Sequence, residues 1–423
     1  MKILFYADTV SGFGGVQRVL SVIAKGLAAR HSVTILTNDT AAGPSDYDYG
    51  ASGVSFDYIT YDSRHDAQYY MCKLASLAYK MGPKKQYAHA VYSRSFFLPR
   101  YRRALTEKIN AGHYDAVIAV HAFFSLHLAA VRRHLNTRMA IGWIHNSYEA
   151  LFVKAYPYLP YLRSFFAYEM KKLNAVVTLT FDDAALFHTR LALNNVKTIY
   201  NPLTITPRGH GGIEHKKFLS MGRFSPRHKG FDILIEAFAI FARENKEWTL
   251  EIVGEGEEEP LCRSLIEHYG LGERASILPF TTDVQGCYAG ASVYVLSSRW
   301  EGFGLVLLEA MSHSLPVISS DIPSSKEILS NSGAHILFPS GDAGQLAAAM
   351  KRMATGADYA AMSAAALRHA SLFSPEEAGK QWEELAGRRS GNKRTAGQSP
   401  SAEMTETKDA SRQPPQESTK DER

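Results

Sequence analysis

The sequence contains little cysteine and no long apolar segment. Its three cysteines, Cys72, Cys262 and Cys287, do not have the spacing of a metal site, and so few thiols suit a reducing compartment. No apolar segment approaches the roughly 18 residues that a membrane-spanning helix needs. The chain reaches an acidic residue, Asp8, too early for a secretory signal peptide. We therefore expect a cytoplasmic protein that is soluble or attached peripherally to the inner face of the cytoplasmic membrane.

A large excess of either charge is also missing. The chain has 47 Lys and Arg against 42 Asp and Glu, which leaves a net charge of +5. This excess is too small and too dispersed to indicate a nucleic-acid partner, although a phosphorylated ligand or an anionic surface could offset it. The apolar fraction of 45% is that of a globular protein, and 423 residues suffice for two domains with separate cores.

Short apolar segments alternate with segments of helical periodicity, which predicts an α/β fold with parallel sheets. We expect strands at residues 3–7, 32–37, 116–120, 139–144, 175–180 and 196–200, and again at 218–222, 249–253, 276–280, 291–296, 315–320 and 334–338. Asn201-Pro202 and the glycine-containing segment after it separate the two series. We place the domains at residues 1–202 and 203–387. Residues 388–423 lack a hydrophobic period and are predicted to be disordered.

A glycine-rich turn, Ser11-Gly12-Phe13-Gly14-Gly15, joins the first strand to the first helix. Gly14 and Gly15 would let the backbone approach a phosphate or a sugar closely. The turn also resembles a dinucleotide fingerprint, but Gln17 occupies the place of the third glycine. A dehydrogenase is therefore an alternative supported only by Asp39 at the end of the second strand.

Two histidines follow strands of the first domain. His121 and His145 each come directly after a predicted strand, and ligands bind at the carboxyl edge of a parallel sheet. We interpret both as hydrogen-bonding groups for a transferred sugar or its acceptor, with a purely structural role as the alternative.

Two further segments of the first domain have ambiguous chemistry. Residues 73–108 contain nine Lys and Arg and one acidic residue, with aromatic residues between them. Such a mixture suits an anionic membrane surface or a phosphorylated acceptor, and equally a solvated basic helix. Asp46-Tyr47-Asp48 has the D-x-D form of a metal site, but we expect no metal and no other cofactor.

The richest pattern lies in the second domain. The glycine-flanked loop after residue 221 contains Arg223 and Lys229, two cations suited to a diphosphate. Phe280 ends another predicted strand and could hold a base, with a place in the apolar core as the alternative. The strand at 291–296 leads through a glycine turn onto a helix, and two carboxylates with seven residues between them, Glu301 and Glu309, bracket this turn. Carboxylates at such a place suit sugar hydroxyls, while the helix N-terminus suits an anion.

These residues resemble the donor-site motifs of the family 4 retaining glycosyltransferases. The similarity rests on Gly222-Arg223, Lys229-Gly230, Glu301-Gly302-Phe303-Gly304 through Glu309-Ala310, Asn201-Pro202 and Leu315-Pro316-Val317. It implies the GT-B fold, in which two Rossmann-like domains face a central cleft and the C-terminal domain holds the donor. The turns at Gly12 and Trp143 look most like those of bacterial enzymes that extend lipopolysaccharide or other surface polysaccharides.

The resemblance also implies a role for each residue. Arg223 and Lys229 would neutralise the diphosphate as its negative charge develops. Glu309 would bind the ribose hydroxyls, and Glu301 would hold the donor sugar and phosphate. Three backbone N–H groups would assist Glu301, those of Phe303, Gly304 and Leu305. In the other domain His121 would contact the transferred sugar, and Gly14 and Gly15 would close on it.

The predicted function is therefore transfer of a hexose or N-acetylhexosamine, with retention, from a nucleotide-sugar to a saccharide acceptor. We expect a UDP-sugar donor and a lipid-linked or saccharide acceptor. A nucleotide-sugar epimerase on the same fold and a non-catalytic nucleotide-sugar-binding protein are the alternatives.

Overall fold

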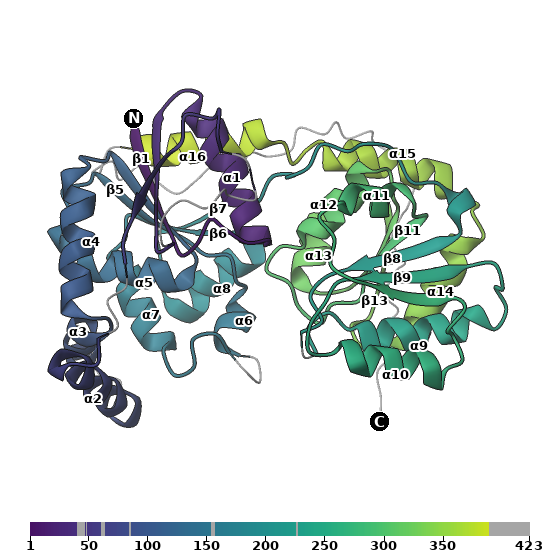
Figure 1. Cartoon of the computed structure of the whole chain (residues 1–423), viewed down its shortest axis with the longest axis horizontal. Coiled ribbons are helices and arrows are strands. Elements are labelled where there is room, and N and C mark those ends of the chain that lie inside the picture. The colour runs from purple at the N-terminus through teal and green to yellow at the C-terminus, as the bar shows by residue number, and fades with distance from the viewer. Residues whose placement is uncertain are drawn as a thin grey trace, which may run out of the picture. The chain divides into compact units, whose positions relative to one another are not determined.

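The computed structural model describes residues 1–39, 47, 49–60, 64–83, 86–153, 157–225 and 227–388. They form two parallel sheets, each covered by helices on both faces (Figure 1). Both sheets belong to one compact unit of the chain. The predicted α/β architecture is confirmed, and each predicted strand occurs with its ends shifted by at most two residues.

The N-terminal sheet has the strand order β3-β2-β1-β4-β5-β6-β7. Its strands are β1 (Lys2–Ala7), β2 (Ser32–Thr37), β3 (Ser55–Tyr58), β4 (Ala116–Val120), β5 (Met139–Trp143), β6 (Ala175–Thr178) and β7 (Val196–Thr198). Its helices are α1 (Gly15–Ala28), α2 (Ala67–Met81), α3 (Gln86–Ser95), α4 (Pro99–Ala111), α5 (Ala122–Val131), α6 (Tyr148–Phe152), α7 (Arg163–Met170) and α8 (Phe181–Leu191). A short 3-10 helix, η1 (Arg132–His134), follows α5.

The C-terminal sheet has the order β10-β9-β8-β11-β12-β13. Its strands are β8 (Lys217–Met221), β9 (Thr249–Val253), β10 (Ala275–Leu278), β11 (Val293–Leu296), β12 (Val317–Ser320) and β13 (His335–Phe338). The 3-10 helix η2 (Ile213–His215) precedes it, and its helices are α9 (Phe231–Ala242), α10 (Glu259–His268), α11 (Val284–Ala289), α12 (Leu305–Ser312), α13 (Pro323–Ile328), α14 (Ala343–Ala354) and α15 (Tyr359–Ala370).

Burial on both faces explains why the strands are continuous apolar runs. In β1, Leu4 and Tyr6 pack into one apolar cluster, whereas Ile3 and Phe5 pack into another on the opposite face. Side chains alternate between the faces of a strand, so each face needs its own apolar residues. Two separate clusters cover the faces of the C-terminal sheet in the same way.

The last helix, α16 (Pro375–Gly387), packs against the N-terminal sheet. Trp382 is 1% exposed and lies in the same apolar cluster as Trp143 of β5, with 4.7 Å between their ring centroids. The chain therefore returns to the first sheet after completing the second. The boundary placed at residue 202 stays a prediction.

Helix α2 directs an apolar face to solvent. Tyr70, Leu74, Leu77 and Met81 lie on one side of this helix and are between 55% and 80% exposed, and Tyr79 is its only buried residue. Figure 1 shows α2 and α3 beyond the end of α4, away from the sheet. Among the described residues, no helix is long and apolar enough to cross a membrane.

Candidate functional site

The loops after β8 and β11 meet at the carboxyl edge of the C-terminal sheet, where they bring Lys229 against Glu301. The Lys229 Nζ atom lies 2.6 Å from Glu301 Oε1, and the two side chains are only 14% and 11% exposed. Ser298 Oγ donates a second hydrogen bond to the same oxygen, at 2.7 Å. The sequence placed both residues at strand ends along one edge of the sheet, and the fold brings them together as a buried ion pair, because β8 and β11 are neighbours.

The charge of Glu301 depends on this partner. Burial by itself raises the pKa of the Glu301 carboxyl, but the Lys229 ammonium, His228 and two hydrogen bonds outweigh burial and hold the pKa below its ordinary value. Glu301 is therefore ionised at neutral pH. The ion pair therefore holds the Lys229 side chain in a fixed position at this edge of the sheet.

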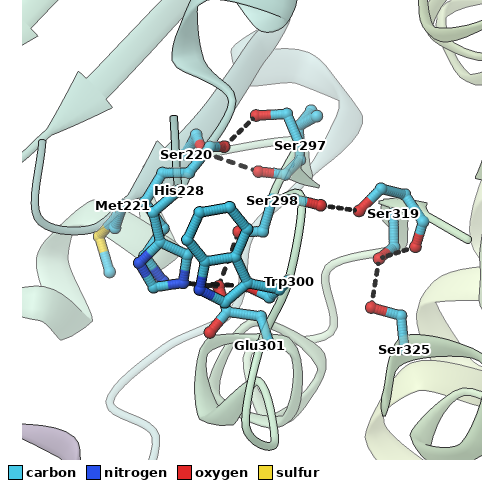
Figure 2. A network of polar contacts seen from close by, with 12 residues as sticks. Ser220, Met221, His228, Ser297, Ser298, Trp300, Glu301, Ser319 and Ser325 are labelled. Atoms are coloured by element: carbon cyan, nitrogen blue, oxygen red, sulfur yellow. Dashed lines mark hydrogen bonds and ion pairs between the residues drawn. The ribbon is translucent and has the colours of Figure 1, made fainter. Parts of the chain in front are cut away.

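Buried serines hold the two loops together behind the ion pair. Ser297 Oγ donates to the Lys229 carbonyl at 2.8 Å, and Ser320 Oγ donates to the Ser298 carbonyl at 2.5 Å. Figure 2 shows Ser298 beside Glu301, with the His228 ring stacked on Trp300. His228 Nε2 also lies 2.9 Å from the Trp300 carbonyl oxygen. The contacts of Ser297 and His228 fix the two loops against each other, and Ser320 ties the second loop to β12, so the pair is preorganised.

Arg299 ties the turn to the helix that follows the Lys229 loop. Its guanidinium forms two hydrogen bonds with Asp232 in the first turn of α9, at 3.0 and 2.7 Å. Its backbone N–H donates to the His228 carbonyl at 2.9 Å. Arg299 was not among the predicted site residues, and its hydrogen bonds to Asp232 and His228 show that it supports the turn that contains Glu301.

Two glycines let the turn enter α12. Gly304 caps the helix with φ of +89°, a left-handed conformation that residues with a Cβ rarely adopt. A Cβ on Gly302 would lie 2.3 Å from the His145 carbonyl oxygen, so the turn contacts the N-terminal domain at backbone distance. Phe303 is 3% exposed and packs near Tyr200 and Phe373.

Glu309 lies one helical turn further along α12 and is almost fully buried. Its Oε1 atom lies 2.8 Å from Arg18 NH2 and accepts a hydrogen bond from Thr204 Oγ1 at 3.2 Å. Its Oε2 atom accepts a hydrogen bond from the Tyr288 hydroxyl at 3.0 Å. Arg18 belongs to α1, so this ion pair joins the two domains.

A cavity of about 440 Å³ lies beside these groups, and we call it the Arg223 cavity. Its wall contains six of the residues that the sequence singled out, Gly14, Gly15, Arg223, Lys229, Phe280 and Glu309. The remaining wall is formed by Phe13, Arg18, Met221, Gly222, Val253, Gly254, Glu255, Thr281, Val284 and Val306. Arg223 is exposed, and its guanidinium has no hydrogen bond or ion pair with any described residue.

An aromatic pair forms one side of the Arg223 cavity. The rings of Phe13 and Phe280 have centroids 5.4 Å apart and are 48% and 44% exposed. Phe13 was not identified as a site residue in the sequence, although it sits within the predicted glycine turn. Arg18 was also missed, and its signal was its position three residues after Gly15, on the helix face that faces the turn.

His121 and His145 do not line the Arg223 cavity. Burial lowers the pKa of both imidazoles, to about 3 for His145, where the nearby His121 adds to the effect. His121 has φ of +86° and ψ of 154°, a region nearly exclusive to glycine. Its backbone N–H donates to the Trp143 carbonyl at 2.8 Å. The two histidines are therefore neutral and lie close together.

Glu301, Phe303, Gly304 and Leu305 also lie outside the wall of the Arg223 cavity. A Cβ on Gly15 would meet Leu305 Cδ1 at 3.3 Å, so the first turns of α1 and α12 approach each other closely. The roles predicted for Glu301 and for the first residues of α12 stay predictions.

Asp46 and Asp48 lie outside the described residues, and the described part of the chain contains no cluster of three metal-binding side chains.

The two sheets and this arrangement define the GT-B class. Residues 13–206 match the family model "Glycosyltransferase Family 4", and residues 211–368 match "Glycosyl transferases group 1". The chain belongs to the family 4 glycosyltransferases, as the sequence motifs predicted.

Relatives of known or inferred activity match the chain over part of its length. An uncharacterized glycosyltransferase of Haemophilus influenzae is 35% identical over 145 residues, which are 34% of this chain and 41% of that protein. The lipopolysaccharide 1,6-galactosyltransferase of Salmonella typhimurium is 30% identical over 139 residues, 31% of this chain and 38% of that enzyme. The chain thus spans less than half the length of these relatives.

Solved structures confirm the fold over nearly the whole chain. The Anabaena protein HepE, solved in complex with UDP-glucose, superimposes with a TM-score of 0.68 over 91% of this chain and 98% of its own. Its sequence is 19% identical.

Replacing Lys229 tests the ion pair. In Lys229→Met the buried Glu301 carboxylate loses its counter-charge, and we expect the free energy of unfolding at neutral pH to fall by about 3 kcal/mol. Because the folded-state pKa of Glu301 is lowered, its stabilisation is complete above the ordinary glutamate pKa and disappears as the pH falls through the lowered value. The difference between wild type and variant should therefore shrink on acidification in urea-unfolding experiments.

Lys351→Met is the matched control. Lys351 pairs with Glu244 at 2.5 Å, but both side chains are more than 60% exposed, so little stability should be lost at any pH. Equal losses of unfolding free energy in the two variants would show that burial of the Glu301 carboxylate does not strengthen its dependence on Lys229.

Proposed function

We propose that the protein is a retaining glycosyltransferase that moves a hexose or N-acetylhexosamine from a UDP-sugar to a saccharide acceptor during synthesis of lipopolysaccharide or another surface polysaccharide. The observation that carries this proposal is the Arg223 cavity at the carboxyl edge of the sheet, whose wall has three cations and two carboxylates, the buried one being Glu309. The Salmonella relative is a lipopolysaccharide galactosyltransferase, and the Anabaena neighbour was solved with UDP-glucose.

The diphosphate would lie between Arg223 and Lys229. Lys229 uses one donor for Glu301, and an ammonium has three, so two remain for phosphate oxygens. The exposed Arg223 guanidinium offers a bidentate fork. As the bond between the sugar and the diphosphate breaks, these fixed charges stabilise the negative charge that develops on the leaving group.

The nucleoside would lie between the aromatic pair and Glu309. The faces of Phe13 and Phe280 suit a base, and stacking does not require a particular hydrogen-bond pattern. Ribose hydroxyls would bind Glu309 by replacing the Arg18 guanidinium, since Glu309 Oε1 is already occupied at 2.8 Å. Donor binding would then loosen one contact between the domains and offer the freed arginine to the phosphates.

The acceptor side of the reaction would use the N-terminal domain. His121 and His145 are neutral over the physiological range because their pKa values are lowered, so each can donate and accept a hydrogen bond with sugar hydroxyls. The strained backbone of His121 is the kind of feature that persists at functional sites. Closure of the domains would exclude water and favour transfer over hydrolysis.

Binding of donor sugars tests the proposal. Calorimetry with UDP-, GDP- and ADP-sugars should reveal a preference for one UDP-sugar, and Arg223→Ala should weaken it roughly tenfold or more because a charge-assisted contact is lost. Arg227→Ala is the matched control, since Arg227 lies in the same loop but not in the wall of the Arg223 cavity. Affinity that is unaffected by Arg223→Ala would contradict the proposal.

The same preparation separates the alternatives. A transferase releases UDP in proportion to glycosylated acceptor, an epimerase changes the sugar of the donor without any acceptor, and a non-catalytic protein does neither. Nuclear magnetic resonance of the donor, with and without lipopolysaccharide acceptors, distinguishes these outcomes.

A lipid-linked acceptor would bring the N-terminal domain to an anionic membrane. The exposed face of α2 contains Tyr70, Leu74, Leu77 and Met81, and residues 67–95 contain no acidic residue. An apolar helix face flanked by cations suits the interface of an anionic bilayer. We extend the proposal to peripheral binding through α2.

Charged substitutions on α2 test this binding. Leu74→Glu with Leu77→Glu should abolish sedimentation with anionic vesicles and leave UDP-sugar affinity unchanged, because apolar insertion is replaced by repulsion. Leu372→Glu, at a residue that is 70% exposed in the other half of the chain, is the control. Unchanged sedimentation of the double variant would exclude α2 as the contact.

A further inference from the structure

A second cavity, of about 500 Å³, lies among α3, α4, α5 and α7 of the N-terminal domain. We call it the basic pocket, and its five cations are Arg94, Arg102, Arg132, Arg133 and Lys172. The polar residues Ser93, Tyr168 and Asn174 also form its wall.

The basic pocket lies at the opposite edge of the N-terminal sheet from the glycine turn, which contributes Gly14 and Gly15 to the Arg223 cavity. Arg132 and Arg133 follow the last turn of α5, and Asn174 comes directly before β6. Both positions belong to the amino-terminal edge of the parallel strands, whereas His121 and the glycine turn belong to the carboxyl edge. The two cavities share no residue, so the basic pocket is a separate site.

The positive charge of the basic pocket is poorly compensated. None of its four arginines forms a salt bridge with a described residue, and Lys172 pairs with the buried Glu169 at 2.5 Å. Burial lowers the pKa of Arg102, and repulsion from Arg133 and Arg94 adds to this effect while Glu169 opposes it. Cations so close together within one hollow are stabilised when an anion binds.

Hydrogen bonds to neighbouring residues hold three of these cations in place. Arg132 Nε and NH2 both donate to Asn174 Oδ1, at 3.2 and 3.1 Å. Arg102 NH1 donates to the Arg94 carbonyl at 2.8 Å, and Lys172 Nζ donates to Ser93 Oγ at 3.2 Å. These contacts leave further N–H groups of the same side chains for a ligand, because a guanidinium has five donors and an ammonium three.

We propose that the basic pocket binds a diphosphate or a pair of phosphate groups. A single carboxylate on a ligand would leave most of the five charges without a partner, whereas phosphate oxygens match several arginine forks at once. The volume of the basic pocket exceeds that of one phosphate ion. The ligand would be a soluble diphosphate compound or a phosphorylated lipid headgroup, which share this chemistry.

Calorimetry with inorganic pyrophosphate tests the proposal, and it is done in the Arg223→Ala background because the Arg223 cavity would also attract this ion. Arg94→Gln with Arg133→Gln, both exposed residues, should weaken pyrophosphate binding roughly tenfold or more. Arg190→Gln, an exposed arginine of the same domain outside the basic pocket, should change nothing. Thermal unfolding verifies that each variant is folded.

The proposal would be overturned if pyrophosphate did not bind in the Arg223→Ala background, or if its affinity were unchanged by the double substitution. Neither result depends on whether UDP-sugars bind, so the proposed donor site is judged separately.

Vesicles of phosphatidylcholine with and without phosphatidic acid identify the source of the phosphate. Sedimentation that pyrophosphate competes away, and that the double variant loses, assigns the basic pocket to a headgroup. If pyrophosphate binds in calorimetry but does not reduce sedimentation, or if the protein does not sediment with the vesicles, the basic pocket is assigned to a soluble ligand.

Discussion

The burial of the Glu301 carboxylate opposite the Lys229 ammonium is the constraint on which the arrangement beside the Arg223 cavity depends. Leaving either charge buried and alone would cost several kcal/mol, so the loops after β8 and β11 must stay in contact. Ser297, Ser298 and Ser320 provide hydrogen bonds at the same junction. One cation is thereby presented to the Arg223 cavity in a fixed position, which is what electrostatic stabilisation of a leaving group requires.

The second ion pair has a different character. Arg18 reaches Glu309 from α1, so the carboxylate expected to bind ribose is neutralised by the other domain when no donor is present. A buried carboxylate without a partner would be destabilising, and the arginine removes that penalty until ribose hydroxyls replace it. If ribose binds Glu309 as proposed, occupancy of the Arg223 cavity would be coupled to this contact between the domains.

Much of the fold could be predicted from the sequence because buried parallel strands leave continuous apolar runs. The strand β3 was missed, since Ser55–Tyr58 is short, only partly buried and lacks such a run. The helices α2, α3 and α4 were not predicted as separate elements. In α2 the large apolar side chains lie on the exposed face, so their spacing does not mark a face that packs against the core.

The candidate site followed the same logic. Residues at the ends of different strands, such as Lys229 after β8 and Glu301 after β11, could be placed together because the carboxyl ends of parallel strands meet at one edge of the sheet. Arg18 and Phe13 could not be placed at the site in this way, since their role depends on how one domain packs against the other. The basic pocket likewise combines four helices that are distant in sequence, and only their packing gathers its cations.

A crystal structure of the full chain with UDP tests the central claim most directly. We expect diphosphate oxygens within hydrogen-bond distance of Arg223 and Lys229, with ribose hydroxyls at Glu309 in place of the Arg18 guanidinium. UDP bound elsewhere, or bound while the pair between Arg18 and Glu309 remains intact, would contradict it.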